Sequence, residues 1–448
     1  MRTRFSPTLC ALAALSSLAT AQVPEGWYVF GTFNPSAGQT GLFLAHPRRP
    51  GQPTVLANVQ GDLDGTGSSC VLYRESDGAI LAGERAPVGG SVDLHMIQLN
   101  GSAVLFDASF SLGRGGPCCG EIPQMALLPD GRVVVAVTDV DAGPLKNILT
   151  TGYGWQGVGI VDTSSGLITP IDIANGALLT DVFNALALAP DASKVYLGTY
   201  VSGTRGDIWE VPIGGGMATL IASTPAGLSN MAFEVSGELL VTTLDATQPL
   251  FRVTVSNGAV VPVPMAIGSL NAIASEATTG GLALATGTNG TPRRSIYWAD
   301  PNANPTLLST PGLATPSGIA MRPTPREIGN ATSGNASYAF RMPNPTGLPN
   351  TGNASYALIL DATGNARPGY LVLSSAALTT PLSVYGCDIF VDPTAIALIA
   401  AVPQPPVAIP LGIPSDPNLV GLQLFAQSFH AEAPTQLLAT AALALTIL

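Results

Sequence analysis

The chain has 448 residues, of which 10% are charged and 46% are hydrophobic, and it contains 50 glycines and 38 prolines. This apolar content excludes wholesale disorder, and the many glycines and prolines favour a turn-rich all-β protein over a helical one. The formal net charge is −11, so the surface repels phosphate backbones and anionic membranes, and nucleic acid is not an expected partner. The length predicts two domains.

Residues 1–21 have the three parts of a secretory signal peptide. Arg2 and Arg4 form a basic region, an apolar run follows, and Ala19-Thr20-Ala21 matches a small-x-small cleavage site. The apolar run is too short to span a bilayer. We therefore expect a secreted or cell-surface protein, with the periplasm as an alternative, and no transmembrane segment after cleavage.

Most of the region up to residue 323 reads as one repeated unit of four short β-strands. The clearest copy is 184–223, in which turn residues separate four β-runs. The strand that opens each unit recurs at intervals of roughly 40–60 residues, the length of a propeller blade. These opening strands begin at Ser69, Gln124, Asn184, Asn230, Asn271 and Ser317.

The strand count is offset at the two ends of this region. The strand at 42–46 has no opening strand before it, and the opening strand at 317–323 has no companions after it. Both anomalies disappear if 317–323 pairs with 27–33, as the inner strand of the first blade. The sequence therefore predicts a six-bladed β-propeller over 22–323, closed by the pairing of its N- and C-terminal strands.

The units resemble those of six-bladed propellers of the NHL and gluconolactonase-like type. The resemblance rests on openings such as Asn271-Ala-Ile-Ala and on turns such as Pro129-Asp130-Gly131, and it covers roughly residues 27–323. In gluconolactonase-like propellers the rim of the central tunnel holds a divalent cation through Asn and carboxylate ligands. The resemblance thus implies a cation-dependent lactonase or lyase as one function.

Inner strands line the tunnel of a propeller, so the residues that open them are expected at its mouth. We interpret six of them as candidate ligand-binding residues: Ser69, Gln124, Asn184, Asn230, Asn271 and Ser317. This ring contains no carboxylate, which a hard cation prefers, and the nearest acids in the sequence are Glu121 and Asp181. The competing interpretation is that the ring side chains bridge neighbouring strand ends.

One Gly-rich turn has the alternating oxygen donors of a short calcium loop. Asp62 and Asp64 are its candidate metal ligands, followed by Thr66 and Ser68. The loop lacks the bidentate glutamate of an EF-hand, because Tyr73 stands at that position. A solvated turn between blades is the alternative, and no cofactor other than calcium is expected.

The cysteines and histidines give little support for catalysis. Cys70 begins one inner strand and Cys119 precedes the next, so an exported protein could join them in a disulfide between adjacent blades, with a Cys118–Cys119 bridge as the alternative. The histidines, His46, His95 and His430, are widely spaced, and no G-x-S-x-G motif accompanies them. Neither a Ser-His-Asp triad nor a zinc centre is expected.

The composition changes after residue 323. Residues 324–334 are predicted to be a linker, and the similar segments that begin at Asn335 and Asn353 open a series of strands with Pro-rich breaks. This pattern predicts a β-sandwich over 335–448. Residues 413–427 resemble the closing part of a C-terminal sandwich module of secreted environmental-bacterial proteins, and that resemblance implies a compartment but no chemistry.

Together these observations predict a secreted or cell-surface binding or scaffold protein without a catalytic set, whose ligand or surface partner the sequence does not name. The alternative is a divalent-cation-dependent lactonase or lyase at the tunnel mouth. Candidate binding loops on the tunnel-mouth face are 59–68, 109–123, 140–153 and 174–183.

Overall fold

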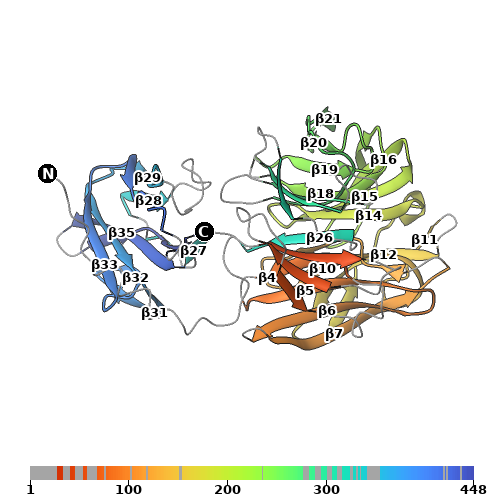
Figure 1. Cartoon of the computed structure of the whole chain (residues 1–448), viewed down its shortest axis with the longest axis horizontal. Coiled ribbons are helices and arrows are strands. Elements are labelled where there is room, and N and C mark those ends of the chain that lie inside the picture. The colour runs from red at the N-terminus through yellow and green to blue at the C-terminus, as the bar shows by residue number, and fades with distance from the viewer. Residues whose placement is uncertain are drawn as a thin grey trace.

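The computed structural model is built almost entirely of β-strands, which confirms the predicted all-β class (Figure 1). A short 3-10 turn, η1, lies at Gly176–Leu178, and none of the described residues forms a helix able to span a membrane. The structure describes residues 28–33, 41–45, 54–57, 68–74, 77–100, 103–117, 120–150, 154–234, 236–275, 282–287, 294–299, 305–309, 315–322, 326–328, 331–332, 334–340, 354–416, 419, 422–433 and 436–447. The predicted signal peptide lies outside these residues.

The two ends of the repeat region meet in one sheet. Its strand order is β26-β1-β2-β3, with β26 at Thr315–Met321, β1 at Tyr28–Phe33, β2 at Gly41–Ala45 and β3 at Thr54–Ala57. β26 and β1 are antiparallel, with Tyr28 opposite Met321 and Phe30 opposite Ile319. The predicted closure by the terminal strands is therefore confirmed.

Three more four-stranded sheets follow the same antiparallel meander, in which each strand pairs with the next along the chain. They are the blade-like units expected of a propeller. The first contains β14 (Val182–Leu188), β15 (Lys194–Ser202), β16 (Arg205–Pro212) and β17 (Thr219–Thr224). The second contains β18 (Leu228–Phe233), β19 (Leu239–Thr243), β20 (Leu250–Thr254) and β21 (Ala259–Pro262). The third contains β22 (Leu270–Ser275), β23 (Leu282–Thr286), β24 (Ile296–Ala299) and β25 (Thr306–Ser309).

The remaining repeat strands form one ten-stranded sheet. It contains the meander of β4 (Ser68–Arg74), β5 (Ala79–Ala86), β6 (Ser91–Asn100) and β7 (Ala103–Gly115). It also contains β9 (Met125–Leu127), β10 (Val133–Ala142), β12 (Trp155–Asp162) and β13 (Leu167–Pro170), with the short strands β8 (Gly120–Glu121) and β11 (Ile148–Leu149). β8 and the end of β7 join the two meanders by pairing with β10. Because two units are joined, the number of separate blades stays a prediction.

Part of this sheet corrects the loop assignments made from the sequence. Residues 109–123 were expected to form a loop, but β7 continues to Gly115 and β8 follows at Gly120. The segment 140–153 likewise contains the end of β10 and the short strand β11. Pairing of β7 with β6, of β8 with β10 and of β11 with β12 thus makes strands of these segments, although their glycines and prolines favour a loop.

The sheets of the repeat region are buried on both faces. In β10, Val133, Val135 and Val137 belong to one hydrophobic cluster, whereas Val134 and Ala136 belong to the next. Side chains alternate across a strand, so β10 is packed between two neighbouring units. Burying a side chain such as valine stabilises the fold by roughly 1.5–3 kcal/mol, which explains why these strands are continuous apolar runs.

The strands after β26 pair only with one another among the described residues. The larger sheet contains β27 (Arg326–Ile328), β37 (Ala442–Thr446), β35 (Gln423–Ala433), β30 (Gly369–Ser374) and β33 (Ile396–Val402), with β36 (Gln436–Ala439) on β35. The smaller sheets are β28 (Ala336–Phe340), β29 (Ala357–Gly364) and β34 (Val407–Pro410), and the pair β31 (Ala377–Val384) and β32 (Cys387–Val391). These strands form the group on the left of Figure 1, which we call the C-terminal body.

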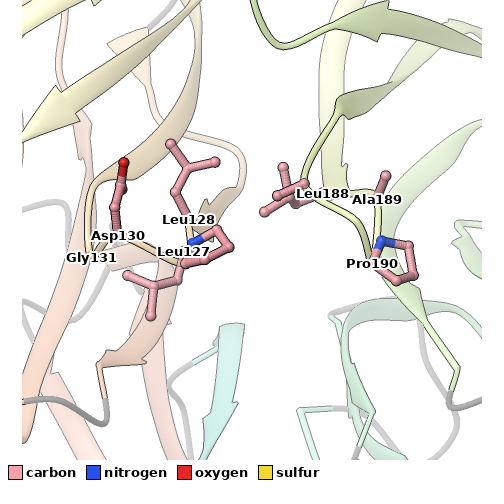
Figure 2. Close-up of a pocket in the computed structure, with 9 residues that line it drawn as sticks. Leu127, Leu128, Asp130, Gly131, Leu188, Ala189 and Pro190 are labelled. Carbon is pink, nitrogen blue, oxygen red and sulfur yellow. The ribbon is translucent and has the colours of Figure 1, made fainter.

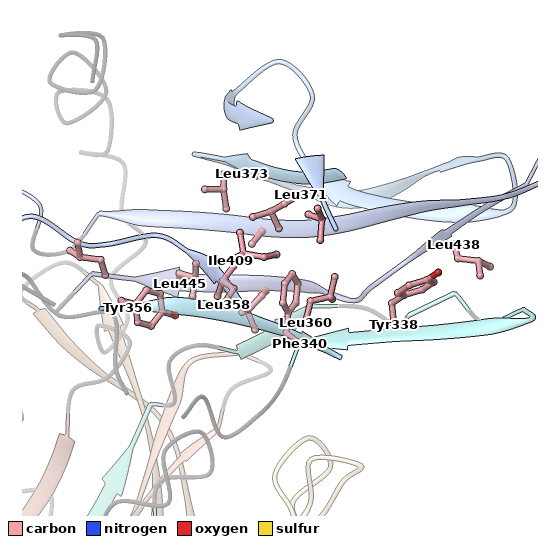
Figure 3. Packing of buried hydrophobic residues seen from close by; sticks show 14 of the residues in the cluster. Tyr338, Phe340, Tyr356, Leu358, Leu360, Leu371, Leu373, Ile409, Leu438 and Leu445 are labelled. Atoms are coloured by element: carbon pink, nitrogen blue, oxygen red, sulfur yellow. The ribbon is translucent and has the colours of Figure 1, made fainter. Parts of the chain in front are cut away.

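The two main sheets of the C-terminal body share one hydrophobic core. Figure 3 shows Phe340 and Leu360 of the smaller sheet facing Leu371 and Leu445 of the larger one, and all four belong to one buried cluster. This is the layered packing expected of a β-sandwich. One boundary differs from the prediction, because β27 lies inside the predicted linker 324–334 and pairs with β37.

His430 is a buried polar residue in this core. Its ring stacks on that of Tyr338 with centroids 3.7 Å apart, Nδ1 lies 2.9 Å from the carbonyl oxygen of Arg367, and Nε2 lies 2.8 Å from Oγ of Ser428. A carbonyl only accepts, so Nδ1 carries the proton and Nε2 accepts from the hydroxyl. Burial lowers the pKa of His430 below its usual value, against the opposing effect of the carbonyl groups of Arg367 and Pro368.

Acid should therefore destabilise the C-terminal body through His430. The pKa of His430 is lower in the folded than in the unfolded state, so the unfolded chain binds more protons as the pH falls below about 6.5. The free energy of unfolding then falls by up to about 1.4 kcal/mol per pH unit. We expect thermal unfolding of this body to be independent of His430 above that pH and to occur at lower temperature below it. Calorimetry of wild type and His430→Gln between about pH 8 and about pH 5 checks this. The same change of unfolding temperature with pH in both proteins would contradict this prediction.

Candidate functional site

The inner strands of the repeat units begin with a one-residue bulge. In β14, Phe183 lies opposite Thr199 and Ala185 opposite Gly198, so Asn184 has no partner on β15. A bulged residue leaves the strand ladder, and its side chain is redirected. Ser69, Ser229, Asn271 and Ser317 likewise have no register partner on the adjacent strand of their sheet.

The bulged side chains bond to the next inner strand around the ring. Asn184 Nδ2 donates to the carbonyl of Leu228 at 3.1 Å, and Asn271 Nδ2 donates to the carbonyl of Pro316 at 3.5 Å. Each acceptor directly precedes the next bulged residue. The hydroxyls do the same: Ser229 donates to Leu270 at 2.5 Å, Ser317 donates to Ser68, and Ser69 donates to Ile122 at 2.7 Å.

Gln124 bonds to two other inner strands. Its Nε2 donates to the carbonyl of Met231 at 2.6 Å. Its Oε1 accepts from the backbone N–H of Leu186 at 2.8 Å and from that of Met231 at 3.2 Å. One side chain thus joins the start of β9 to two other inner strands, β14 and β18.

Five of the six predicted ring residues therefore hydrogen-bond to backbone groups of another inner strand: Ser69, Gln124, Asn184, Asn271 and Ser317. This is the competing interpretation of the sequence, in which the ring side chains join strand ends. Asn230 differs, because Ser229 is the bulged residue of its strand. Asn230 is 4% exposed, and its buried Oδ1 has no hydrogen-bond partner among the described residues.

The two acids nearest to the ring in sequence have other neighbours. Glu121 Oε2 lies 3.5 Å from Nε of Arg85; burial raises the pKa of Glu121, and Arg85 opposes that rise. Burial also raises the pKa of Asp181, and the nearby charge of Asp207 adds to the effect. Within the described part of the chain neither acid hydrogen-bonds to a ring side chain, so the ring offers only neutral donors and acceptors.

The predicted calcium ligands Asp62 and Asp64 lie outside the described residues. Among the residues that are described, one group of three His, Asp or Glu side chains could hold a metal ion, namely Glu84, Asp93 and His95. It lies on β5 and β6, the second and third strands of their unit. Nothing in the sequence indicates this group, because Glu84 comes near Asp93 and His95 only through the pairing of β5 with β6.

Cys70 corrects the disulfide prediction. It is a free and buried thiol whose sulfur packs against Gly83, within a cluster that includes Leu81 and Ile122. Burial in these apolar surroundings raises the pKa of the thiol far above its usual value. The Cys70–Cys119 disulfide is therefore not formed at Cys70, and Cys119 lies outside the described residues.

A cavity of about 600 Å³ lies at the opposite end of the inner strands (Figure 2). The cavity lies between the turn after β9 and the turn after β14, and it is lined by Leu128, Pro129, Ala189 and Pro190. Asp130 supplies the one carboxylate of the lining, and that carboxylate pairs with Arg132 at 2.7 Å. The cavity thus offers apolar contact but no set of converging polar groups.

No protein-family model matches the chain, and the search of curated proteins gave no match. Among solved structures it is similar to a gluconolactonase from Xanthomonas campestris (14% identity, 60% of this chain and 86% of that chain, TM-score 0.38). It is also similar to a PQQ-bound aldose sugar dehydrogenase from Streptomyces coelicolor (16% identity, 61% and 91%, TM-score 0.38), and to a puromycin hydrolase (12% identity, 75% and 52%, TM-score 0.37). At such identities and TM-scores these likenesses say nothing of ligand or reaction.

Proposed function

We propose that this protein is a secreted or cell-surface propeller that binds a partner and carries no catalytic centre at its hub. The observation that supports this is the use of the hub side chains: Ser69, Gln124, Asn184, Asn271 and Ser317 bond to neighbouring inner strands. The amide of Gln124 is engaged at both its nitrogen and its oxygen, and the asparagine and serine side chains are directed at neighbouring strands by the bonds that they donate. The ring therefore resembles a structural clamp more than a set of cation ligands, for which carboxylates are preferred. Function must then come from the surface.

The proposal includes the remaining architecture. The six four-strand units are six blades of the NHL type over 22–323, residues 1–21 are a signal peptide that directs export, and the C-terminal body is a sandwich module over 335–448. The sandwich attaches the protein to the cell envelope, and the propeller presents its binding face. An acidic chain with a net charge of −11 suits neither nucleic acid nor anionic lipid as the partner.

We assign the contact surface to β11 and η1, on the side where the inner strands begin. Leu149 is 57% exposed and Leu178 is 61% exposed, and β11 contacts η1. Lys146 lies beside them, with Nζ 4.9 Å from the ring centre of Trp155. Exposed apolar side chains that lie side by side are typical of protein-binding surfaces, so the expected partner is a protein of the cell surface.

The binding test compares purified wild type with the Leu149→Asp/Leu178→Asp variant on washed envelopes of the source cells. We expect the variant to bind at least about tenfold more weakly, because two exposed apolar contacts are replaced by charges. Leu167→Asp is the matched control, since Leu167 is 62% exposed at a turn on the other side. Equal binding by all three proteins would exclude this surface.

The rival function is a divalent-cation-dependent lactonase or lyase at the hub. One observation favours it, the buried and unpartnered Oδ1 of Asn230, which a ligand could satisfy. A panel of aldonolactones, assayed with and without a chelator, separates the two functions. We expect no chelator-sensitive hydrolysis, and turnover that the chelator abolishes and Asn230→Ala removes would establish the rival instead.

A further inference from the structure

One buried polar position recurs at the end of the second strand of each unit. This position lies opposite the start of the first strand of the unit. In the unit of β14–β17, for example, Thr199 lies opposite Phe183, which directly precedes the bulged Asn184. In five units this residue is a threonine that is at most 2% exposed: Thr32, Thr138, Thr199, Thr243 and Thr286. In the unit of β4–β7 it is Glu84, opposite Ser68 and 1% exposed.

Three of these threonines have a structural role that glutamate cannot take over. Thr32 donates to the carbonyl of Gly41 at 3.3 Å, Thr199 to that of Asp207 at 3.4 Å, and Thr286 to that of Ser295 at 3.3 Å. Each bond joins the second strand to the third. An ionised carboxylate has no proton to donate, and burying its charge is unfavourable unless a cation compensates it. An ionised Glu84 therefore cannot make the hydrogen bond by which these threonines join the second strand to the third.

Glu84 shares one face of the sheet with Asp93 and His95. Gly83 lies opposite Leu94 and Ala82 opposite His95, so continuing the register by one residue places Glu84 opposite Asp93. His95 Nε2 lies 3.3 Å from Oε2 of Glu84, and one ligand atom from each of the three residues lies within 4.8 Å of the others. Ligand atoms around a zinc ion are about 3.3–3.5 Å apart, so the pair of Glu84 and His95 already has this spacing.

The equivalent aspartate in another unit is neutralised by an arginine of its own strand. Asp207 is the third residue of β16, as Asp93 is of β6, and its two oxygens accept from Arg205 at 2.9 and 2.8 Å. In β6 the place of Arg205 is taken by Ser91. Asp93 instead accepts from Ser91 at 2.5 Å and from Ser109 at 3.3 Å, and among the described residues no Lys or Arg forms an ion pair with it.

The unit of β4–β7 thus differs from the other units by its buried carboxylate, and it differs from the unit of β14–β17 also by lacking the arginine. Both changes raise the negative charge at one place, beside an imidazole. Asp93 is only half-buried and its serine neighbour Ser109 is partly exposed, so an ion can reach the carboxylates from solvent. Two carboxylates and a neutral imidazole cancel the charge of a divalent ion, and the nitrogen donor favours a transition metal over calcium or magnesium.

We propose that Glu84, Asp93 and His95 bind one divalent transition-metal ion, with Zn²⁺ as the best match. The ion links β5 to β6, as the hydroxyls of Thr32, Thr199 and Thr286 link the second strand to the third in their units. This site is distinct from the ring at the hub and does not depend on the proposed binding function.

The test uses the full-length protein after treatment with a chelator and gel filtration. Calorimetric titration with ZnCl₂ should show one site per chain, and Co²⁺ should give a visible absorption band. Glu84→Thr should weaken Zn²⁺ binding by at least about 100-fold and should fold normally, because threonine occupies this position in the five other units. Glu210→Gln, which removes a carboxylate paired with Lys194 on the outside of β16, should leave Zn²⁺ affinity unchanged.

Thermal unfolding supplies a second measurement. Zn²⁺ should raise the unfolding temperature of wild type and of Glu210→Gln, and should not raise that of Glu84→Thr or His95→Gln. Unchanged Zn²⁺ affinity in Glu84→Thr, or no Zn²⁺ binding by folded wild type, would overturn the proposal. A metal bound at the hub would persist in Glu84→Thr, so failure of this site and failure of the proposed function give different results.

Discussion

Replacing Gly318 by alanine is expected to lower the free energy of unfolding of the repeat region by about 3 kcal/mol, the range of severe overpacking. A Cβ atom at this position would lie 2.5 Å from Cα of Cys70 and 2.5 Å from the backbone nitrogen of Val71. These are backbone atoms of β4, which cannot move without moving its sheet. Gly318 lies in β26, the strand that closes the ring. Urea unfolding followed by circular dichroism measures the effect.

Gly214→Ala is the matched control for this prediction. No atom lies within 4 Å of the Cβ position at Gly214, so the substitution should change stability by less than about 0.5 kcal/mol. If the two variants were equally stable, β26 would not be packed tightly on β4, and the closure of the ring would be loose.

Gln124→Ala is expected to destabilise the repeat region by about 2–4 kcal/mol. The substitution removes three hydrogen bonds, to the N–H of Leu186 and to both backbone groups of Met231, and each such bond contributes about 0.5–1.5 kcal/mol. The measurement is again the midpoint of urea unfolding. Gln436→Ala, at an exposed position in β36, serves as the control and should be close to neutral.

This experiment also distinguishes the two interpretations of the hub. If Gln124 holds strands together, its loss changes stability. If it served a ligand instead, Gln124→Ala would leave the unfolding midpoint unchanged and alter ligand binding. The same reasoning applies to Asn184, whose side chain donates to Leu228, with a smaller effect because it makes one bond.

The closure of the repeat region could be predicted because it depends on counting strands. An unpaired opening strand at 317–323 and a unit without one at 27–58 leave a single solution that removes both exposed edges. The linker at 324–334 was wrong in detail because β27 is only three residues long, Arg326–Ile328. A strand this short has no recognisable period of its own, and its pairing with β37 decides its structure.

The ring residues show where residue types alone mislead. Aligning the units on asparagine placed Asn230 with Asn184 and Asn271, yet the strand register makes Ser229 the equivalent residue. A bulge inserts one residue and reverses the direction of every side chain on one side of it. Asn230 is consequently buried, with Oδ1 unpartnered, while Ser229 reaches the next strand.

The amino-acid sequence by itself determined the all-β class, the four-strand unit, its repetition and the pairing of the terminal strands, because turn residues and apolar runs are local signals whose spacing survives in the chain order. Only the tertiary structure decided which side chains meet. Glu84 and Asp93 are separated by a turn in sequence but lie opposite one another across β5 and β6, and Gln124 reaches Met231, 107 residues away. The strand register and the bulges decide which of these side chains come into contact. Both depend on how several strands pack together, so they cannot be derived from the sequence of one segment.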